Sequence, residues 1–250
     1  HSDDELHPVK GGVAGALTLN PLERIENIQS DNDTEFADPF TRDEIDRIAT
    51  ADPERLADSR MIVFNCRAGL SLSELIAVGV DDVDLVAGTL SVRRACVAGE
   101  FKVPKEKARI RTIELIAPAL ELMKAIMADA AGTEATQVTI VQRDNITKKH
   151  EKVRFLFHRS TSGLLWNGRV LSEWFTEHLR KAGIRHRCAN QARHTFASQA
   201  LSSYVPIEWV ARQLGHSDTT MVRKHYGRWI SKDTKSMADI VSKMMGFLAV

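Results

Sequence analysis

Residues 193–230 read RHTFASQALSSYVPIEWVARQLGHSDTTMVRKHYGRWI, and the predicted fold is organised around them. Apolar side chains recur at helical spacing over residues 192–203, which predicts a helix with one buried face. A proline opens a second predicted helix over residues 207–214, and Gly215 ends it. The third helix is short and carries Tyr226 near its end. The stretch therefore predicts three consecutive helices, the last of them bearing a tyrosine.

Three side chains of this stretch suit chemistry at a phosphodiester. A tyrosine phenol can attack phosphorus and hold the broken strand end as a phosphotyrosine ester. Its unperturbed pKa is about 10, so a reaction near neutral pH needs a cationic site around the phosphate. The planar fork of Arg193 can bind two phosphate oxygens, and His216 can donate a further hydrogen bond. We therefore expect Tyr226 to be the nucleophile, with Arg193 and His216 as donors to the phosphoryl group.

Neighbouring side chains receive simpler interpretations. Tyr204 lies in the loop between the first two helices and is expected to pack there. His194 follows Arg193 directly and is expected to face the other side of the helix, in a structural role. Basic residues near Tyr226 could form a solvated face or contact DNA phosphates. We expect DNA contact from four of them, Arg187, Arg223, Lys224 and Arg228.

The order of these motifs resembles the active-site half of a tyrosine recombinase, the phage-integrase family. The resemblance rests on RHTFAS at residues 193–198, LGH at 214–216, and Tyr226 ten residues further on. It extends over about residues 36–232, most of the chain. It implies the mainly α, α+β fold of DNA breaking-rejoining enzymes, a helical domain with a small antiparallel β-sheet at one edge. It also implies strand cleavage by Tyr226 with neither a metal ion nor a cofactor.

Two positions depart from the family pattern. The segment GLSLSEL at residues 69–75 is similar to the family's Gly-Leu-Arg-x-Ser-Glu-Leu block, but Ser71 holds the position of a phosphate-binding arginine. Arg67 could replace that arginine, although an ordinary arginine at a helix end is the better interpretation. Where the family's His-x-x-Arg motif has histidine, this chain has Asn190. Asparagine can donate a hydrogen bond to phosphate but cannot exchange a proton near neutral pH.

A lysine hairpin completes the set of expected catalytic residues. Alternating residues predict strands over 89–94, 95–103 and 110–116, which form the small sheet. In the family, the hairpin before the last of these strands presents a lysine that protonates the departing 5′ oxygen. Lys105 matches that position best and Lys107 second, whereas a hairpin lysine without this context would be read as solvated.

The remaining elements follow from local patterns. Thr41 and Glu44 form a capping box that opens the catalytic domain. Apolar spacing predicts the other elements, namely helices over 56–67, 117–131 and 170–182, a polar segment over 132–152 around a short apolar run, and a strand over 153–157.

Charge is divided unevenly along the chain, although the formal net charge is only +1. Residues 1–58 hold five Lys or Arg against fifteen Asp or Glu, a net charge of −10. Residues 169–232 hold eleven against four, a net charge of +7. A polyanion responds to the local field, so the basic part agrees with DNA binding. Three scattered cysteines and the lack of a long apolar run predict a cytoplasmic protein without a membrane span.

We expect three regions. Residues 1–39 are expected to be a disordered or linker segment that follows a missing core-binding domain. Residues 40–232 form the catalytic domain. Residues 233–250 place apolar side chains on one helix face, which predicts a C-terminal helix exchanged between protomers, although packing on its own domain is the ordinary alternative.

The sequence thus predicts site-specific recombination of DNA through a 3′-phosphotyrosine intermediate, as in integration or excision of a prophage or mobile element. The expected partners are a double-stranded recombination site, three further copies in a tetramer on DNA, and an accessory directionality factor. The main alternative is a degenerate integrase that binds DNA without cleaving it, because of Ser71 and Asn190. Type IB topoisomerases share the chemistry but are disfavoured by LGH and the domain size. A helix-turn-helix regulator over 192–214 would leave Tyr226 unexplained.

Overall fold

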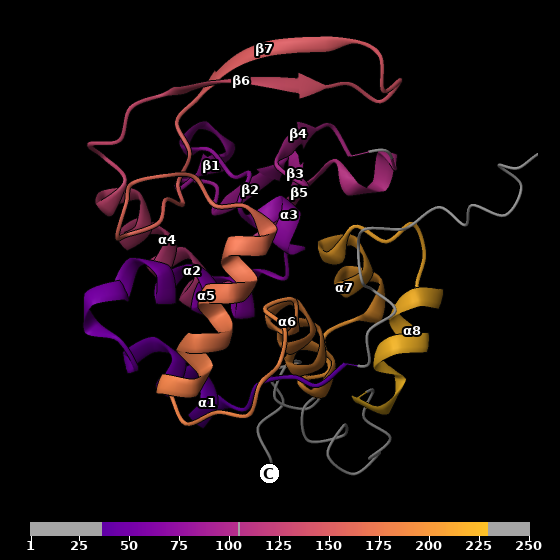
Figure 1. The fold of residues 1–250 in the computed structure, drawn as a ribbon. Helices are drawn as coiled ribbons and strands as arrows, with labels where there is room; N and C mark the ends of the chain where they lie inside the picture. Colours follow the sequence, from indigo (N-terminus) through magenta and orange to yellow (C-terminus); the bar gives the residue numbers. More distant parts are fainter. Residues whose placement is uncertain (1–36, 105, 230–250) are drawn as a thin grey trace, which may run out of the picture. The chain divides into compact units, whose positions relative to one another are not determined.

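The computed structural model describes residues 37–104 and 106–229, all within residues 33–250, the second of two units into which the chain divides. The expectations for residues 1–36 and 230–250, which include the linker and the C-terminal helix, lie outside the described residues. The helices are α1 (Arg42–Thr50), α2 (Leu56–Ala68), α3 (Leu72–Leu75), α4 (Ala117–Asp129), α5 (Gly168–Lys181), α6 (Gln191–Ser202), α7 (Ile207–Leu214) and α8 (Thr220–Tyr226) (Figure 1). The strands are β1 (Val83–Asp84), β2 (Thr89–Val92), β3 (Ala95–Val97), β4 (Glu100–Lys102), β5 (Arg111–Glu114), β6 (Thr136–Val141) and β7 (Lys148–Val153).

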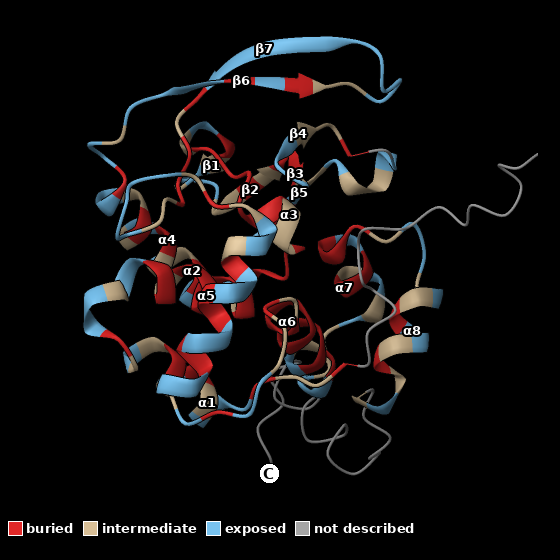
Figure 2. Ribbon diagram, in the orientation of Figure 1, coloured by how far each residue is buried: buried red, intermediate tan, exposed pale blue. Residues whose placement is uncertain are grey.

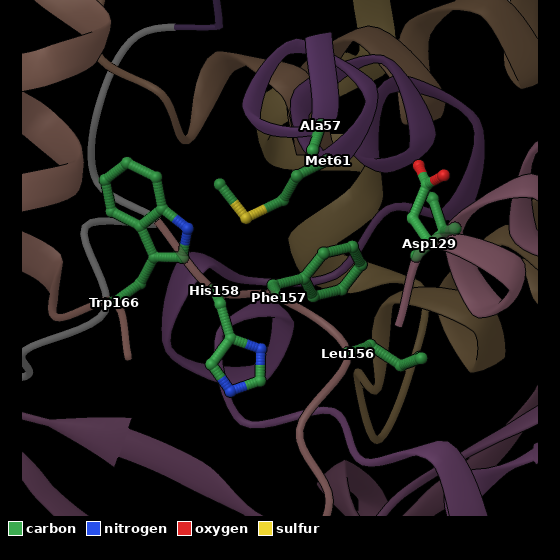
Figure 3. Close-up of a pocket in the computed structure, with 8 residues that line it drawn as sticks. Ala57, Met61, Asp129, Leu156, Phe157, His158 and Trp166 are labelled. Carbon is green, nitrogen blue, oxygen red and sulfur yellow. The ribbon is translucent and has the colours of Figure 1, made fainter. Parts of the chain in front are cut away.

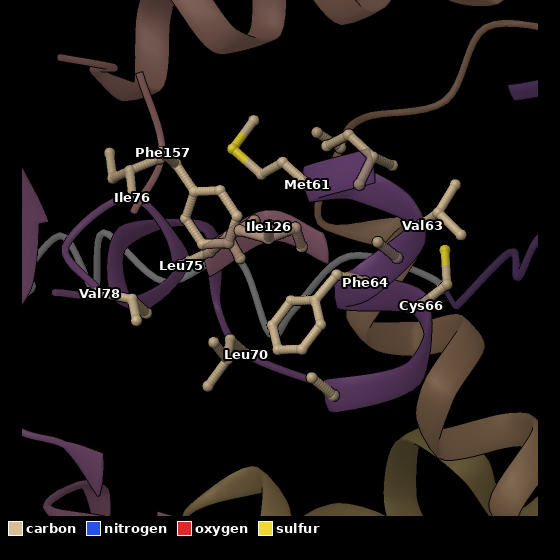
Figure 4. Close-up of a cluster of buried hydrophobic side chains, with 14 of the residues drawn as sticks. Met61, Val63, Phe64, Cys66, Leu70, Leu75, Ile76, Val78, Ile126 and Phe157 are labelled. Carbon is tan, nitrogen blue, oxygen red and sulfur yellow. The ribbon is translucent and has the colours of Figure 1, made fainter. Parts of the chain in front are cut away.

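Helix α2 is the central helix of this unit. It packs against α1, α4 and α6 and is buried over most of its surface, as expected of a helix that is apolar on several faces (Figure 2). Figure 4 shows Met61 and Phe64 of α2 in one apolar cluster with Ile126 of α4 and Phe157. The helix predicted over residues 56–67 is confirmed, and its buried apolar side chains belong to the larger hydrophobic core.

A second apolar cluster joins α6, α7 and α8. Its larger buried members are Phe196 and Leu201 of α6, Val210 and Leu214 of α7, and Val222 and Tyr226 of α8. The three helices predicted from residues 193–230 are confirmed, and Gly215 ends α7 in the left-handed region, at φ 78°. Because these side chains are buried against one another, the cluster fixes how the segments that carry RHTFAS, LGH and Tyr226 pack together.

The β-structure is more extensive than the single small antiparallel sheet that the sequence predicts. One sheet has the antiparallel order β1-β2-β5, with Leu90 opposite Ile113. The other has the order β3-β4-β6-β7, and its β4–β6 pair is parallel, with Phe101 opposite Ile140. The expected strand over 95–103 is instead the hairpin β3–β4, which turns at Ala98 and Gly99 with positive φ values of 51° and 84°.

The polar segment 132–152 also differs from expectation, because it forms the hairpin β6–β7. Of the strand predicted over 153–157, Val153 ends β7, and Phe155 makes an isolated bridge to Gly79. The mainly α, α+β class is confirmed. The capping box of α1 is confirmed as well, with the Thr41 side chain and Glu44 bonded to each other's backbone.

Candidate active site

Arg193 holds the expected active-site segments together. Its side chain is fully buried at 0% exposure. Nη1 donates to the carbonyl oxygen of Gly69 at 3.0 Å, and Nη2 donates to that of Leu214 at 2.9 Å. These two carbonyls end α2 and α7, so one guanidinium fixes α6 against the segments that lead to Ser71 and His216.

Gly69 allows this close approach. It caps α2 with a φ of 75°, a left-handed conformation that glycine adopts without steric cost. A Cβ atom at this position would lie 2.4 Å from Cδ1 of Phe196, well inside contact distance. The end of α2 therefore reaches α6 only because residue 69 has no side chain.

Ser71 has a local structural function where the family pattern has arginine. It is the N-cap of α3, and its hydroxyl accepts a hydrogen bond from the backbone N–H of Glu74 at 3.4 Å. The Glu74 carboxylate in turn accepts from the backbone N–H of Ser71 at 3.0 Å, completing a capping box. The substituted position is therefore a helix cap.

Arg67 stays at the end of α2. Its Nη1 donates to the carbonyl oxygen of Pro118, at the start of α4, at 3.2 Å. This contact agrees with the interpretation of Arg67 as an ordinary helix-end arginine.

A different arginine lies beside Glu74. Arg111, the first residue of β5, pairs with both carboxylate oxygens, at 2.9 Å from Nη1 to Oε1 and 3.1 Å from Nη2 to Oε2. Burial acts to raise the pKa of Glu74, but the charges of Arg111 and Arg193 outweigh it and bring that pKa to about 2. The carboxylate is therefore ionised at neutral pH.

Arg111 also reaches the turn that carries His216. Its Nε donates to the carbonyl oxygen of Gln213 at 2.7 Å, and a Cβ atom at Gly215 would lie 2.7 Å from its Nη1. Sequence reasoning missed Arg111, since an arginine at the edge of a predicted strand is usually solvated. No sequence pattern marked it, because the carboxylate that it meets lies 37 positions away along the chain.

Tyr226 lies at the end of α8 and contacts His194. The hydroxyl oxygen is 2.6 Å from Nδ1 of His194, and the two side chains belong to residues that are 2% and 1% exposed. The sequence reasoning placed His194 on the other side of the helix from Arg193, in a structural role, and did not foresee its contact with Tyr226. Asn190 and His194 are four positions apart on one helix and share a face, which the sequence reasoning overlooked.

The other expected catalytic residues lie near this centre or outside the described residues. His216 is half-buried in the turn after Gly215, and its backbone N–H donates to the carbonyl oxygen of Ala211 at 3.0 Å. Asn190 is the N-cap of α6 and is also half-buried. Lys105 lies outside the described residues, whereas Lys107 is exposed at the start of a single 3₁₀ turn, Lys107–Arg109.

The four expected DNA-contacting residues fall into two groups. Arg223 and Lys224 are exposed on α8. Arg228 donates to the carbonyl oxygen of Ala37 and lies over the ring of Trp229. Arg187 bonds both carboxylate oxygens of Glu44, and a phosphate would have to displace that carboxylate. Arg228 is exposed as well, but like Arg187 it bonds another group of the protein, so we propose phosphate contact for Arg223 and Lys224 only.

A small cavity lies elsewhere in the unit. Its volume is about 30 Å³, close to that of one water molecule. Figure 3 shows Met61, Phe157, His158 and Trp166 around it, and none of the expected site residues is among those that line it. The cavity therefore belongs to the packing of α2 and α4 and is too small for a nucleotide.

The described residues contain neither a metal-binding cluster nor a membrane-spanning helix. Within residues 37–104 and 106–229, no cluster of three or more His, Cys, Asp or Glu side chains could hold a metal ion. In the same part of the chain, every helix is too short or too polar to cross a membrane.

Comparison with known proteins adds related sequences. The prophage integrase IntR of Escherichia coli (strain K12) is 29% identical over 231 residues, which cover 87% of this chain and 53% of IntR. IntQ of the same strain, whose name marks it as defective, is 28% identical over 243 residues, covering 94% of this chain and 60% of IntQ. The chain spans little more than half the length of these relatives.

Solved structures share the fold. A Tn1549 transposon integrase in complex with a circular intermediate DNA matches with a TM-score of 0.63 and 18% identity, over 86% of this chain and 68% of that one. A lambda integrase dimer bound to a core site matches with a TM-score of 0.51 and 13% identity, over 79% and 60%. The sequence model of the phage integrase family matches residues 39–230, which include the whole α6–α8 region. The chain belongs to the phage integrase family.

Proposed function

We propose that this chain is the catalytic part of a tyrosine-type site-specific recombinase that acts on double-stranded DNA. The integration or excision of a prophage or another mobile element is the process that it serves. The observation that carries the proposal is the position of Arg193, which bonds the carbonyls before Ser71 and His216 and lies next in sequence to the residue that contacts Tyr226. Family membership supports the same reaction class.

The expected catalytic residues and the two exposed basic residues of α8 each have a role in the proposed reaction. The Tyr226 oxygen gives up its proton to a base as it attacks phosphorus and forms a 3′-phosphotyrosine ester, while the 5′ oxygen leaves with a proton from Lys105. Arg193 and His216 donate hydrogen bonds to the non-bridging oxygens, with a further bond from Asn190. Arg223 and Lys224 bind phosphates that flank the cleaved bond, since both are exposed on the helix that carries the nucleophile. Attack by a 5′ hydroxyl of the partner strand reverses the reaction.

The proposed reaction requires a rearrangement when DNA binds. Arg193 is 0% exposed and Tyr226 is 2% exposed, so a phosphate cannot contact either side chain in this conformation. A rearrangement that uncovers Arg193 and the Tyr226 oxygen, while α8 stays packed on α6, would admit it. We propose that assembly on DNA drives this step, in a tetramer whose protomers exchange residues 233–250 and whose direction is set by an accessory factor.

A nicked suicide substrate tests the proposed function. Cleavage near the nick releases a short strand that diffuses away, so the phosphotyrosine ester cannot be reversed. We expect a covalent protein–DNA band that survives denaturation and disappears after protease treatment. DNA binding without this band would contradict the proposal.

The second candidate is a degenerate integrase that binds DNA without cleaving it. The capping role of Ser71 favours it, because a helix cap cannot supply the phosphate-binding charge that an arginine would. Removing one such donor costs about 10²–10³ in rate. The suicide substrate separates the candidates, since the degenerate protein would shift the DNA on a native gel but form no adduct.

A further inference from the structure

The proton of the nucleophile needs an acceptor. An ordinary phenol has a pKa of about 10, so at neutral pH a tyrosine must lose its proton as it attacks phosphorus. An asparagine can donate or accept a hydrogen bond but cannot take a proton. Asn190, at the start of α6, therefore cannot be the base.

His194 lies where such a base must lie. Its Nδ1 is 2.6 Å from the hydroxyl oxygen of Tyr226, within the range of a proton-transfer contact. The ring centroids are 5.5 Å apart, at an interplanar angle of 45°, so the rings do not stack face to face. Both residues are almost completely buried, which removes bulk water as a competing partner at this contact.

The helix places His194 on the same face as Asn190. Residues four positions apart on a helix are neighbours, and α6 is regular from Gln191 to Ser202. Arg193 orients this turn of α6 through its bonds to Gly69 and Leu214. The position of Nδ1 is therefore fixed by the same contacts that assemble the site.

We propose that His194 is the catalytic residue that accepts the proton of Tyr226, an inference that rests on the proposed function. The O–H bond of Tyr226 breaks and an N–H bond forms at Nδ1 while the phenolate oxygen bonds to phosphorus. The bond from phosphorus to the 5′ oxygen breaks, and that oxygen takes a proton from Lys105. In the reverse step, the imidazolium returns its proton to the phenolate oxygen as the 5′ hydroxyl attacks phosphorus.

A more acidic nucleophile tests this assignment. Fluorotyrosine at position 226 of the full chain lowers the pKa of the phenol and with it the need for a base. With ordinary tyrosine, we expect His194→Ala to lower single-turnover cleavage of a suicide substrate by about 10²–10⁴-fold. With fluorotyrosine, we expect the deficit of the same variant to shrink to less than about 10-fold, because a more acidic phenol gives up its proton with less assistance from a base.

His194→Asn is the matched control. Its amide oxygen can accept a hydrogen bond near the position of Nδ1 but cannot take the proton. We expect its deficit to match that of His194→Ala and to be rescued by fluorotyrosine in the same way, while circular dichroism shows both variants folded. A near-parental rate for His194→Asn with ordinary tyrosine would overturn the assignment, since hydrogen bonding alone would then suffice.

Two further outcomes would also overturn it. A deficit that is equal for both nucleophiles would mean that His194 does not act on the phenol proton. Faster cleavage by His194→Ala would mean that the contact only restrains Tyr226. In each case the parent chain still forms its adduct, so the proposed function survives, whereas a parent without any adduct contradicts both.

Discussion

The α6–α8 region and the corner formed by α3 and β5 contrast in how they follow the family pattern. In the first, the pattern is largely intact, and Arg193 bonds the carbonyls of the two adjoining segments. In the second, the arginine position is occupied by Ser71, which caps α3, while Arg111 enters from β5 and pairs with Glu74. Ser71 thus takes on a different function at the substituted position, a hydrogen bond to the backbone of α3. The positive charge at this corner comes from Arg111 on β5 instead.

Arg193→Met should have the largest effect and would break the first region. Two buried carbonyls, of Gly69 and Leu214, would lose their charged donors. We expect a loss of about 3–5 kcal/mol in the free energy of unfolding, and cleavage below detection. Denaturant unfolding and the suicide assay measure the two effects. Arg212→Met, an exposed change on α7, is the control and should stay within about 0.5 kcal/mol. Equal stability of the two variants would contradict the conclusion that Arg193 holds α6 against the ends of α2 and α7.

Arg111→Met would break the second region by leaving Glu74 without its closest cation. We expect a cost of about 3–5 kcal/mol at pH 7, and recovery of much of it in the double variant with Glu74→Gln. Because the folded pKa of Glu74 is about 2, below its ordinary value of 4.5, the ion pair contributes stability above pH 4.5 and loses it as pH falls towards 2. The deficit of Arg111→Met should therefore shrink over that window. A deficit independent of pH would rule out the charge pairing as its cause.

Ser71→Arg sharpens the comparison. Loss of the α3 cap should cost about 1 kcal/mol, and Ser71→Ala should cost about the same. We still expect a higher cleavage rate, by less than the roughly 10²–10³-fold that a phosphate donor supplies, because Arg111 already brings charge to this corner. Single-turnover rates of the two variants measure it. A gain of the full roughly 10²–10³-fold in cleavage rate would show that Arg111 does not act on the phosphate in the parent protein.

Arg67→Ala should have the smallest effect. Within the described part of the chain, its side chain donates a hydrogen bond to one backbone carbonyl, that of Pro118. We expect a change of at most about 0.5 kcal/mol in stability and no change in cleavage. A large loss of cleavage with normal stability would mean that Arg67 reaches the phosphate after all.

The sequence predicted the α6–α8 region well because helical periodicity, Pro206 and Gly215 act locally. The corner of α3 and β5 could not be predicted in the same way. Its ion pair joins residues 37 positions apart, and no periodic pattern records which buried carboxylate an arginine meets. The hairpin β6–β7 was missed because its second strand is polar and exposed on both faces, without the alternation that identifies a strand. The contact between His194 and Tyr226 depends on how α8 packs on α6, which spacing along one helix does not reveal.

Mapping the covalent adduct tests the central claim most directly. The chain contains two tyrosines, Tyr204 and Tyr226, so Tyr204→Phe and Tyr226→Phe form a matched pair. Each variant is incubated with the nicked substrate, and the modified peptide is identified by mass spectrometry. We predict a phosphotyrosine ester at residue 226 in the parent and in Tyr204→Phe, and DNA binding without any adduct in Tyr226→Phe. An adduct that persists in Tyr226→Phe, or that maps to another residue, would contradict the account.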